Sequence, residues 1–191
     1  MKKINVAVLM ILIIFCAVKT YATEWQPVSS KVGRFHVLMP GTPTLKTTVD
    51  HTPVGKIGED LFTLKTKDMT FTIEYSDLPG IAVFFGGRKT IYKKANEGFL
   101  KNVHGKEVSS KNFTHDGKKG LEVTYETPTR NGKVRYLLIS KRLYVTQASI
   151  VKDAKGQPAI DKYLNSFKTG FENNRKIKQK DYRNRNMGHL R

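Results

Sequence analysis

Lysine and arginine dominate the residues of this chain whose side chains could do chemistry. The 191 residues include 34 Lys and Arg against 16 Asp and Glu, a formal net charge of +18 at pH 7. Such a balance attracts phosphate, anionic lipid, acidic polysaccharide or nucleic acid, although solubility alone also accounts for it. Two short segments are the candidates for binding anions. They are Arg88 and Lys89, and the C-terminal group Arg175, Lys176, Lys178, Lys180, Arg183 and Arg185.

The two segments predict different kinds of contact. Arg88 and Lys89 follow a glycine pair and precede a predicted helix, whose first N–H groups attract anions. The glycine spacing of a nucleotide-binding loop is missing, so an ordinary loop is the alternative. The C-terminal group surrounds Tyr182 and predicts binding to anionic lipid, polysaccharide or nucleic acid, or a nuclear address in a host cell. A solvated tail without a partner is its alternative.

Motifs for catalysis, cofactors or metals are not found in the sequence. The five histidines are widely separated, and no HExxH pattern occurs. Ser110 lacks a G-x-S-x-G context, and a triad with His115 and Asp116 would rest only on nearness in sequence. We therefore predict no catalytic residue, no metal and no cofactor. A hydrolase with an unrecognised site stays as the third functional hypothesis.

The first 22 residues have the layout of a secretory signal peptide. Lys2 and Lys3 precede a mostly apolar run from Ile4 to Val18, and Ala22 offers a small-residue cleavage position. Fifteen helical residues span about 22 Å, whereas a hydrocarbon core is about 30 Å thick. An uncleaved anchor is the alternative. Cleavage would also remove Cys16, the single cysteine, so we expect an exported periplasmic or secreted protein without disulfides.

The elements that must position any site begin with a β-rich unit. Alternating apolar residues predict strands over Phe35–Met39, Leu61–Thr66 and Met69–Tyr75, and a weaker, polar and β-branched run predicts another over Leu45–Thr52. From Arg88 to Val103 the period changes to four residues, which predicts an amphipathic helix.

Strands resume after this helix and form a predicted four-stranded meander. Asp116-Gly117 and Asn131-Gly132 are predicted turns within it. Pro158 suits the first turn of a short helix over Ala159–Phe167. The strands are predicted near residues 107–114, 121–125, 134–140 and 143–151.

Several short motifs resemble a group of uncharacterised exported bacterial domains, and the order of elements is similar to the PsbP-like fold. That fold occurs in an oxygen-evolving photosystem protein and in a Ran-binding nuclear-transport protein. The resemblance covers residues 25 to 168 and implies a fold; it implies no active-site residue, because the fold serves unrelated roles. The motifs are Gly33-Arg34-Phe35, Met39-Pro40-Gly41-Thr42-Pro43, Tyr75-Ser76-Asp77-Leu78-Pro79, Gly117-x-x-Gly120-x-Glu122, Arg142-Leu143-Tyr144 and Tyr163-Leu164-Asn165-Ser166-Phe167.

The predicted organisation is a signal peptide over 1–22, a single α+β domain over 23–171 and a disordered basic tail over 172–191. The domain is expected to hold an antiparallel sheet of about seven to eight strands, one longer helix between two β units and a short C-terminal helix. We expect an exported, non-enzymatic binding or accessory domain of unknown ligand that associates with anionic surfaces through its basic tail. The alternative is a secreted effector-like protein whose tail binds nucleic acid or acts as a nuclear address.

Overall fold

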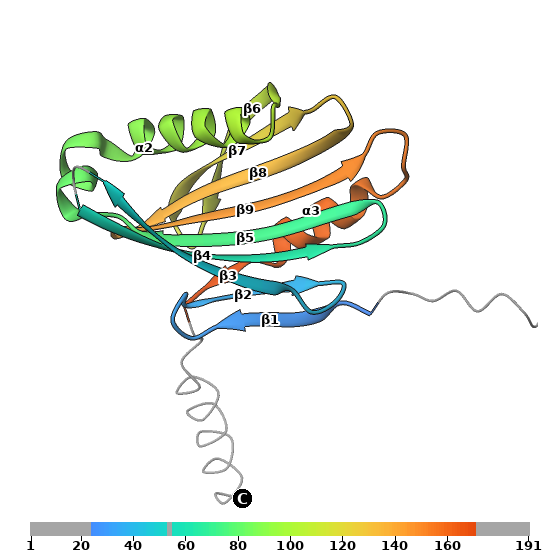
Figure 1. Ribbon diagram of the computed structural model, residues 1–191, viewed down its shortest axis with the longest axis horizontal. Helices are drawn as coiled ribbons and strands as arrows, with labels where there is room; N and C mark the ends of the chain where they lie inside the picture. The colour runs from blue at the N-terminus through green and yellow to red at the C-terminus, as the bar shows by residue number, and fades with distance from the viewer. Residues whose placement is uncertain (1–23, 53–54, 171–191) are drawn as a thin grey trace, which may run out of the picture.

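The computed structural model describes residues 24–52 and 55–170 (Figure 1). The predicted signal peptide, the basic tail and its six anion-binding candidates lie outside these residues. In the described part, a long helix covers one face of a large antiparallel sheet, and a short helix with a small sheet covers the other (Figure 1). The α+β fold class predicted from the sequence is confirmed.

The large sheet has seven antiparallel strands in the order β3-β4-β5-β9-β8-β7-β6. The first unit supplies three neighbouring strands, the meander supplies four, and β5 pairs with β9 to join them. Edge strand β6 carries a bulge between Glu107 and Ser109. The bounds are β3 Thr44–Thr52, β4 Gly55–Lys65, β5 Met69–Asp77, β6 Lys106–His115, β7 Lys118–Glu126, β8 Arg130–Ile139 and β9 Arg142–Val151.

The small sheet consists of β1 (Gln26–Ser30), β2 (Phe35–Met39) and β10 (Lys168–Thr169). β2 lies in the middle and alternates as predicted, with Phe35, Val37 and Met39 buried. Its neighbours β1 and β10 were not predicted, because β10 has only two residues and β1 has no regular apolar alternation.

Two apolar clusters hold the layers together. On one face of the large sheet, Phe71 and Ile73 of β5 pack with β2 and with helix α3 (Gln157–Ser166), which buries Ile160 and Tyr163. On the other face, helix α2 (Gly80–Asn102) packs Tyr92 and Phe99 against β7 and β8. Neither helix in the described ranges is long and apolar enough to cross a membrane.

One predicted turn is wrong. Asn131 and Gly132 lie inside β8, and the chain reverses at Thr127–Arg130, where Thr127 N–H donates to the Arg130 carbonyl at 2.8 Å. Gly132 is required for packing: a Cβ there would lie 2.7 Å from the Tyr125 ring and 2.8 Å from the Ala148 carbonyl oxygen. Gly132 is therefore present to accommodate the tyrosine on the neighbouring strand, although Asn-Gly is also the sequence typical of a hairpin turn.

The long helix also differs from the prediction. Its second part matches the expected helix from Arg88, but the chain is already helical from Gly80 and has non-helical dihedrals at Gly87 (φ 63°, ψ 163°). The positive φ suits glycine, which has no Cβ to clash. α2 is therefore two helical segments joined at a kink, and this kink positions the site described next.

Candidate functional site

A basic cleft opens at the α2 kink, with a volume of about 600 Å³. Arg88, Lys89 and Lys119 line it, together with Tyr92, Asn112 and glycines of the kink. We call this the kink cleft. Arg88 and Lys89 come from the first turn after Gly87, whereas Lys119 comes from β7, thirty positions further along the chain. Folding therefore brings one lysine that is distant in sequence next to two adjacent cations.

Tyr92 fixes the floor of the kink cleft. Its hydroxyl donates to the Lys119 carbonyl at 3.1 Å and accepts the Leu138 N–H at 2.8 Å. Burial raises the pKa of Tyr92, and the Leu138 N–H and the positive charge of Arg88 oppose that rise. The phenol thus stays neutral at physiological pH and ties α2 to β7 and β8.

The cations of the kink cleft have no acidic neighbour in its lining, as far as the structure describes the chain. Among the described side chains that line the cleft there is no Asp or Glu. Among the described residues, no ion pair involves Arg88, Lys89 or Lys119. The first residues of a helix also carry partial positive charge on their free N–H groups. The cleft is therefore suited to an anionic group.

A second basic cleft, of about 580 Å³, lies beside the β8–β9 turn. Arg34, Asp77, Lys141 and Arg142 line it, as does Gly170, the last described residue. We call this the hairpin cleft. Arg142 Nε and Nη2 donate to both Asp77 oxygens, at 2.8 and 2.6 Å, so this acid and base neutralise each other. Hydrogen bonds from Arg142 hold the pKa of Asp77 below its ordinary value. Arg34 and Lys141 remain to attract an anion.

Two of the eight predicted anion-binding residues lie within the described part of the chain, and six do not. The structure places Arg88 and Lys89 together on the kink cleft. Lys119 was missed because a lysine near the start of a strand carries no local signal of which helix lies across from it in space. The whole hairpin cleft was missed for the same reason. The other six candidates, Arg175 to Arg185, lie outside the described residues, and their role stays a prediction.

The loose triad considered above does not form. Ser110 and His115 both lie on β6, five residues apart, which is about 17 Å along an extended strand. An odd spacing also puts them on opposite faces. His115 contacts Asp116 at 3.4 Å and stacks on Phe167, and burial lowers its pKa. Within the described ranges, no three His, Cys, Asp or Glu residues are grouped so as to hold a metal ion.

Glu74 of β5 is a titratable residue that the sequence did not single out as a candidate. Burial, and to a smaller extent the negative charge of Glu59 on the neighbouring β4, together raise the pKa of Glu74 to about 7. The nearby Tyr136 of β8 has its own pKa raised, first by burial and then by Glu74. Glu74 shares its strand face with Thr70 and Thr72, and a face made of polar residues predicts exposure to solvent rather than burial.

Comparison with known proteins identifies the fold. The solution structure of cyanobacterial PsbP (CyanoP) from Synechocystis sp. PCC 6803 matches with a TM-score of 0.55 and 13% identity, over 79% of this chain and 95% of that chain. A Pseudomonas aeruginosa protein of unknown function matches at 8% identity over 68% and 84% of the two chains, but its TM-score of 0.34 is too low to inform the fold. No protein-family model and no curated protein matches. The chain has the PsbP-like fold, as its motifs predicted.

Proposed function

We propose that this protein is an exported, non-enzymatic binding domain that associates with anionic surfaces through the kink cleft. The observation that carries the proposal is that Arg88, Lys89 and Lys119 meet in one cleft whose described lining residues include no Asp or Glu. The signal-peptide layout of residues 1–22 supports export, and the basic segment 172–191 supports a second electrostatic contact.

Three basic side chains that reach an acidic surface together strengthen binding to it. Each basic side chain close to an acidic surface strengthens binding about fivefold, so three together supply on the order of a hundredfold. Charges spread over a whole surface contribute less, because salt screens them beyond about 8 Å at physiological ionic strength. The kink cleft concentrates its three cations within one pocket.

Removing these charges should weaken binding strongly. We expect Arg88→Gln/Lys89→Gln/Lys119→Gln to lower the affinity for phosphatidylglycerol vesicles or heparin about a hundredfold, with a shallower salt dependence. Binding isotherms of the purified protein at several salt concentrations measure both quantities. Phosphatidylcholine vesicles, which carry no net charge, should bind neither protein.

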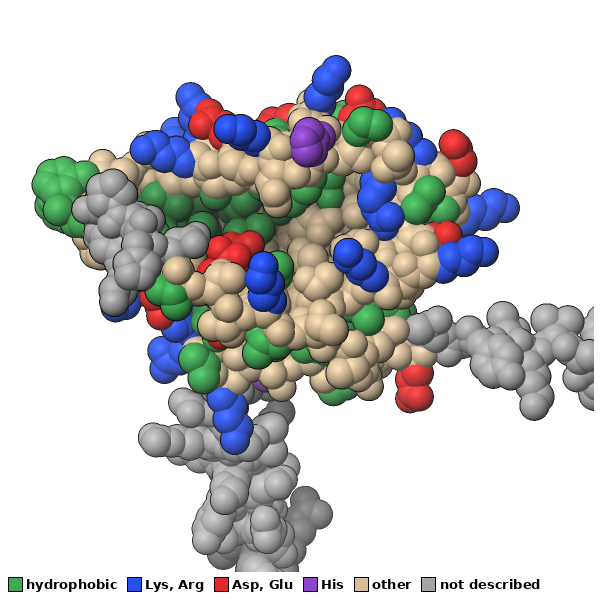
Figure 2. Space-filling view, viewed as in Figure 1, with side chains coloured by type: hydrophobic (Ala, Val, Ile, Leu, Met, Phe, Trp, Pro, Cys, Tyr) green, Lys and Arg blue, Asp and Glu red, His purple; other side chains and the backbone are tan. Residues whose placement is uncertain are grey.

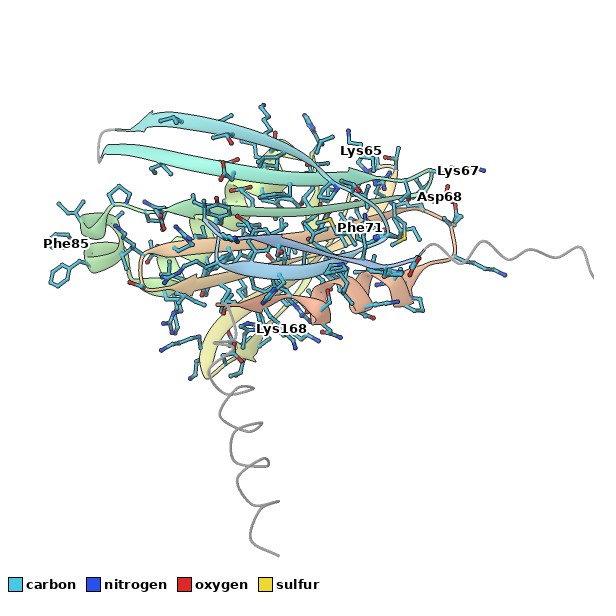
Figure 3. The ribbon with its side chains drawn as sticks, turned by 90° about the horizontal axis from the view of Figure 1, so that it is seen from below. Lys65, Lys67, Asp68, Phe71, Phe85 and Lys168 are labelled. Atoms are coloured by element: carbon cyan, nitrogen blue, oxygen red, sulfur yellow. The ribbon has the colours of Figure 1, made fainter. Side chains whose placement is uncertain are left out.

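A matched control removes three exposed lysines elsewhere. Lys65 and Lys67 lie at the end of the molecule opposite to Phe85 (Figure 3), and Lys155 lies in the loop between β9 and α3. Lys65→Gln/Lys67→Gln/Lys155→Gln should change binding much less than the cleft variant. Equal losses would show that net charge alone acts, and no binding by the unaltered protein would refute the proposed function. A variant without residues 172–191 measures the contribution of the basic tail to binding separately.

Export is testable on its own. When the full chain is produced in a bacterium with a general secretory pathway, we expect it outside the cytoplasm with Thr23 as its new N-terminus. Cell fractionation and N-terminal sequencing measure location and cleavage. Cytoplasmic protein that retains residues 1–22 would contradict the prediction.

A further inference from the structure

The first segment of α2 presents its apolar side chains to solvent. Ile81, Phe84 and Phe85 are 57%, 82% and 78% exposed, and we call them the apolar tip. Their spacing of three and four residues places them on one face of the helix. The two phenylalanine rings pack edge to face with centroids 5.0 Å apart. Figure 2 shows hydrophobic side chains gathered at the end where α2 begins, and Figure 3 shows Phe85 pointing outward there.

This orientation is the reverse of a normal surface helix, whose apolar stripe faces the core. Leu78 and Val83 already anchor the segment by packing against the α2-side cluster. The tip therefore does not hold the fold together. An apolar groove of about 550 Å³ runs along it, lined by Ile81, Phe85 and Ile91. Exposed apolar groups gathered in this way mark interaction sites.

The residues of the two basic clefts lie directly before and directly after the apolar tip along the chain. The hairpin cleft includes Asp77, just before the segment, and Lys141, whose carbonyl oxygen accepts the Leu78 N–H at 2.8 Å. The kink cleft begins at Gly86, directly after Phe85. Asp77, the acid beside the tip, is paired with Arg142. Among the described residues, unpaired cations of both clefts are therefore available next to the tip.

We propose that the apolar tip inserts into the headgroup region of an anionic lipid bilayer while the two basic clefts contact its acidic headgroups. The inference rests on the proposed function and names its partner. Aromatic and aliphatic side chains beside Lys and Arg are the composition of helices that lie in a membrane interface. An anionic polysaccharide or a nucleic acid backbone has no acyl interior to receive two phenylalanines, so the tip favours lipid.

Phe84→Ser/Phe85→Ser tests the proposal. At 0.5 M salt, where charge attraction is screened, we expect affinity for phosphatidylglycerol vesicles to fall on the order of a hundredfold, about tenfold per phenylalanine. Heparin binding at low salt should be unchanged, because the clefts remain. The control Leu45→Ser/Val108→Ser alters two other exposed apolar residues, on edge strands β3 and β6, and should bind vesicles normally. Phe85→Ser alone gives the same test should the double variant not fold.

The vesicle and heparin results together distinguish membrane insertion from binding by charge alone. Loss of vesicle binding with heparin binding retained supports insertion. Unchanged vesicle affinity in Phe84→Ser/Phe85→Ser overturns insertion and leaves the proposed anionic-surface binding intact. Binding of the unaltered protein to heparin but not to vesicles overturns lipid as the partner. Failure to bind either probe overturns both the inference and the proposed function.

Discussion

Replacing Arg135 with methionine is expected to lower the free energy of unfolding by about 3 kcal/mol. Arg135 Nε donates to Glu122 at 2.6 Å, and the Glu122 side chain is only 3% exposed. Nη1 and Nη2 bond Leu164 O and Asn165 Oδ1 at 2.8 and 3.0 Å, which ties β8 to the end of α3. The variant would leave a buried carboxylate and two acceptors without this partner. Denaturant unfolding measures the loss.

The expected loss lies at the low end of the range for broken buried pairs because Lys111 Nζ stays 3.2 Å from Glu122. Burial alone would raise the pKa of Glu122, but Arg135 and Lys111 together hold it below its ordinary value. Once Arg135 is gone, acid should relieve part of the penalty, because Glu122 then takes up a proton more readily.

Two further variants check this explanation. Adding Glu122→Leu to Arg135→Met removes the uncompensated charge and should restore much of the lost stability. Lys93→Ala breaks an exposed pair with Glu97 at 3.9 Å and should cost no more than about 0.5 kcal/mol. An Arg135→Met protein as stable as the original would contradict the assigned role of this buried pair.

Glu74→Gln is expected to stabilise the protein by about 3 kcal/mol at pH 8 and to have little effect at pH 4. Burial, with the charge of Glu59, raises the pKa of Glu74 from 4.5 to about 7. Each pKa unit corresponds to about 1.4 kcal/mol. Glutamine keeps the shape of the neutral carboxyl and cannot ionise, so the variant removes only the cost of the partly buried charge.

The direction in which stability changes with pH depends on whether the folded or the unfolded protein binds the proton of Glu74 more tightly. Below pH 4.5 Glu74 is protonated in both folded and unfolded protein, so it contributes no pH dependence there. Between pH 4.5 and about 7 the unfolded state releases its proton first, and stability falls as pH rises. Above pH 7 both states are ionised and the penalty is constant. Denaturant unfolding of both proteins from pH 4 to pH 8 measures this dependence.

The exposed Glu97 gives the matched comparison, since Glu97→Gln should leave stability nearly unchanged at both pH values. A pH-independent offset in Glu74→Gln, or a loss of stability at pH 8, would refute the assigned environment of Glu74.

The parts of the fold predicted well are those in which local pattern and burial agree. β2 and β5 alternate cleanly because one face of each packs against the core, and the α2 stripe from Ile91 follows the helical period for the same reason. The turn predicted at Asn131-Gly132 was wrong because Gly132 is there to make room for Tyr125 on the neighbouring strand. The residues next to Gly132 in the sequence do not reveal this contact. β1 was missed because its hydrogen bonds to β2, rather than an apolar pattern of its own, define it.

The candidate site was predicted to a smaller extent, for a related reason. A glycine pair before Arg88 and Lys89 is a local signal, and it pointed to the kink cleft. Lys119 joins them only after β7 folds beneath α2, so its role depends on tertiary structure. The apolar tip escaped notice because periodicity analysis assumes that apolar residues face inward. Its outward face breaks that rule, and such exceptions are expected at functional surfaces.

The central claim is that the end of the molecule carrying the apolar tip and its basic clefts is the surface that meets an anionic bilayer. Trp25 is the single tryptophan and packs against Phe71, with ring centroids 5.7 Å apart. A Trp25→Phe/Phe85→Trp protein therefore carries one indole, at the tip. We predict that phosphatidylglycerol vesicles shift its emission to shorter wavelength and that bromine on the acyl chains quenches it. An unshifted, unquenched emission from protein that sediments with the vesicles would contradict the account.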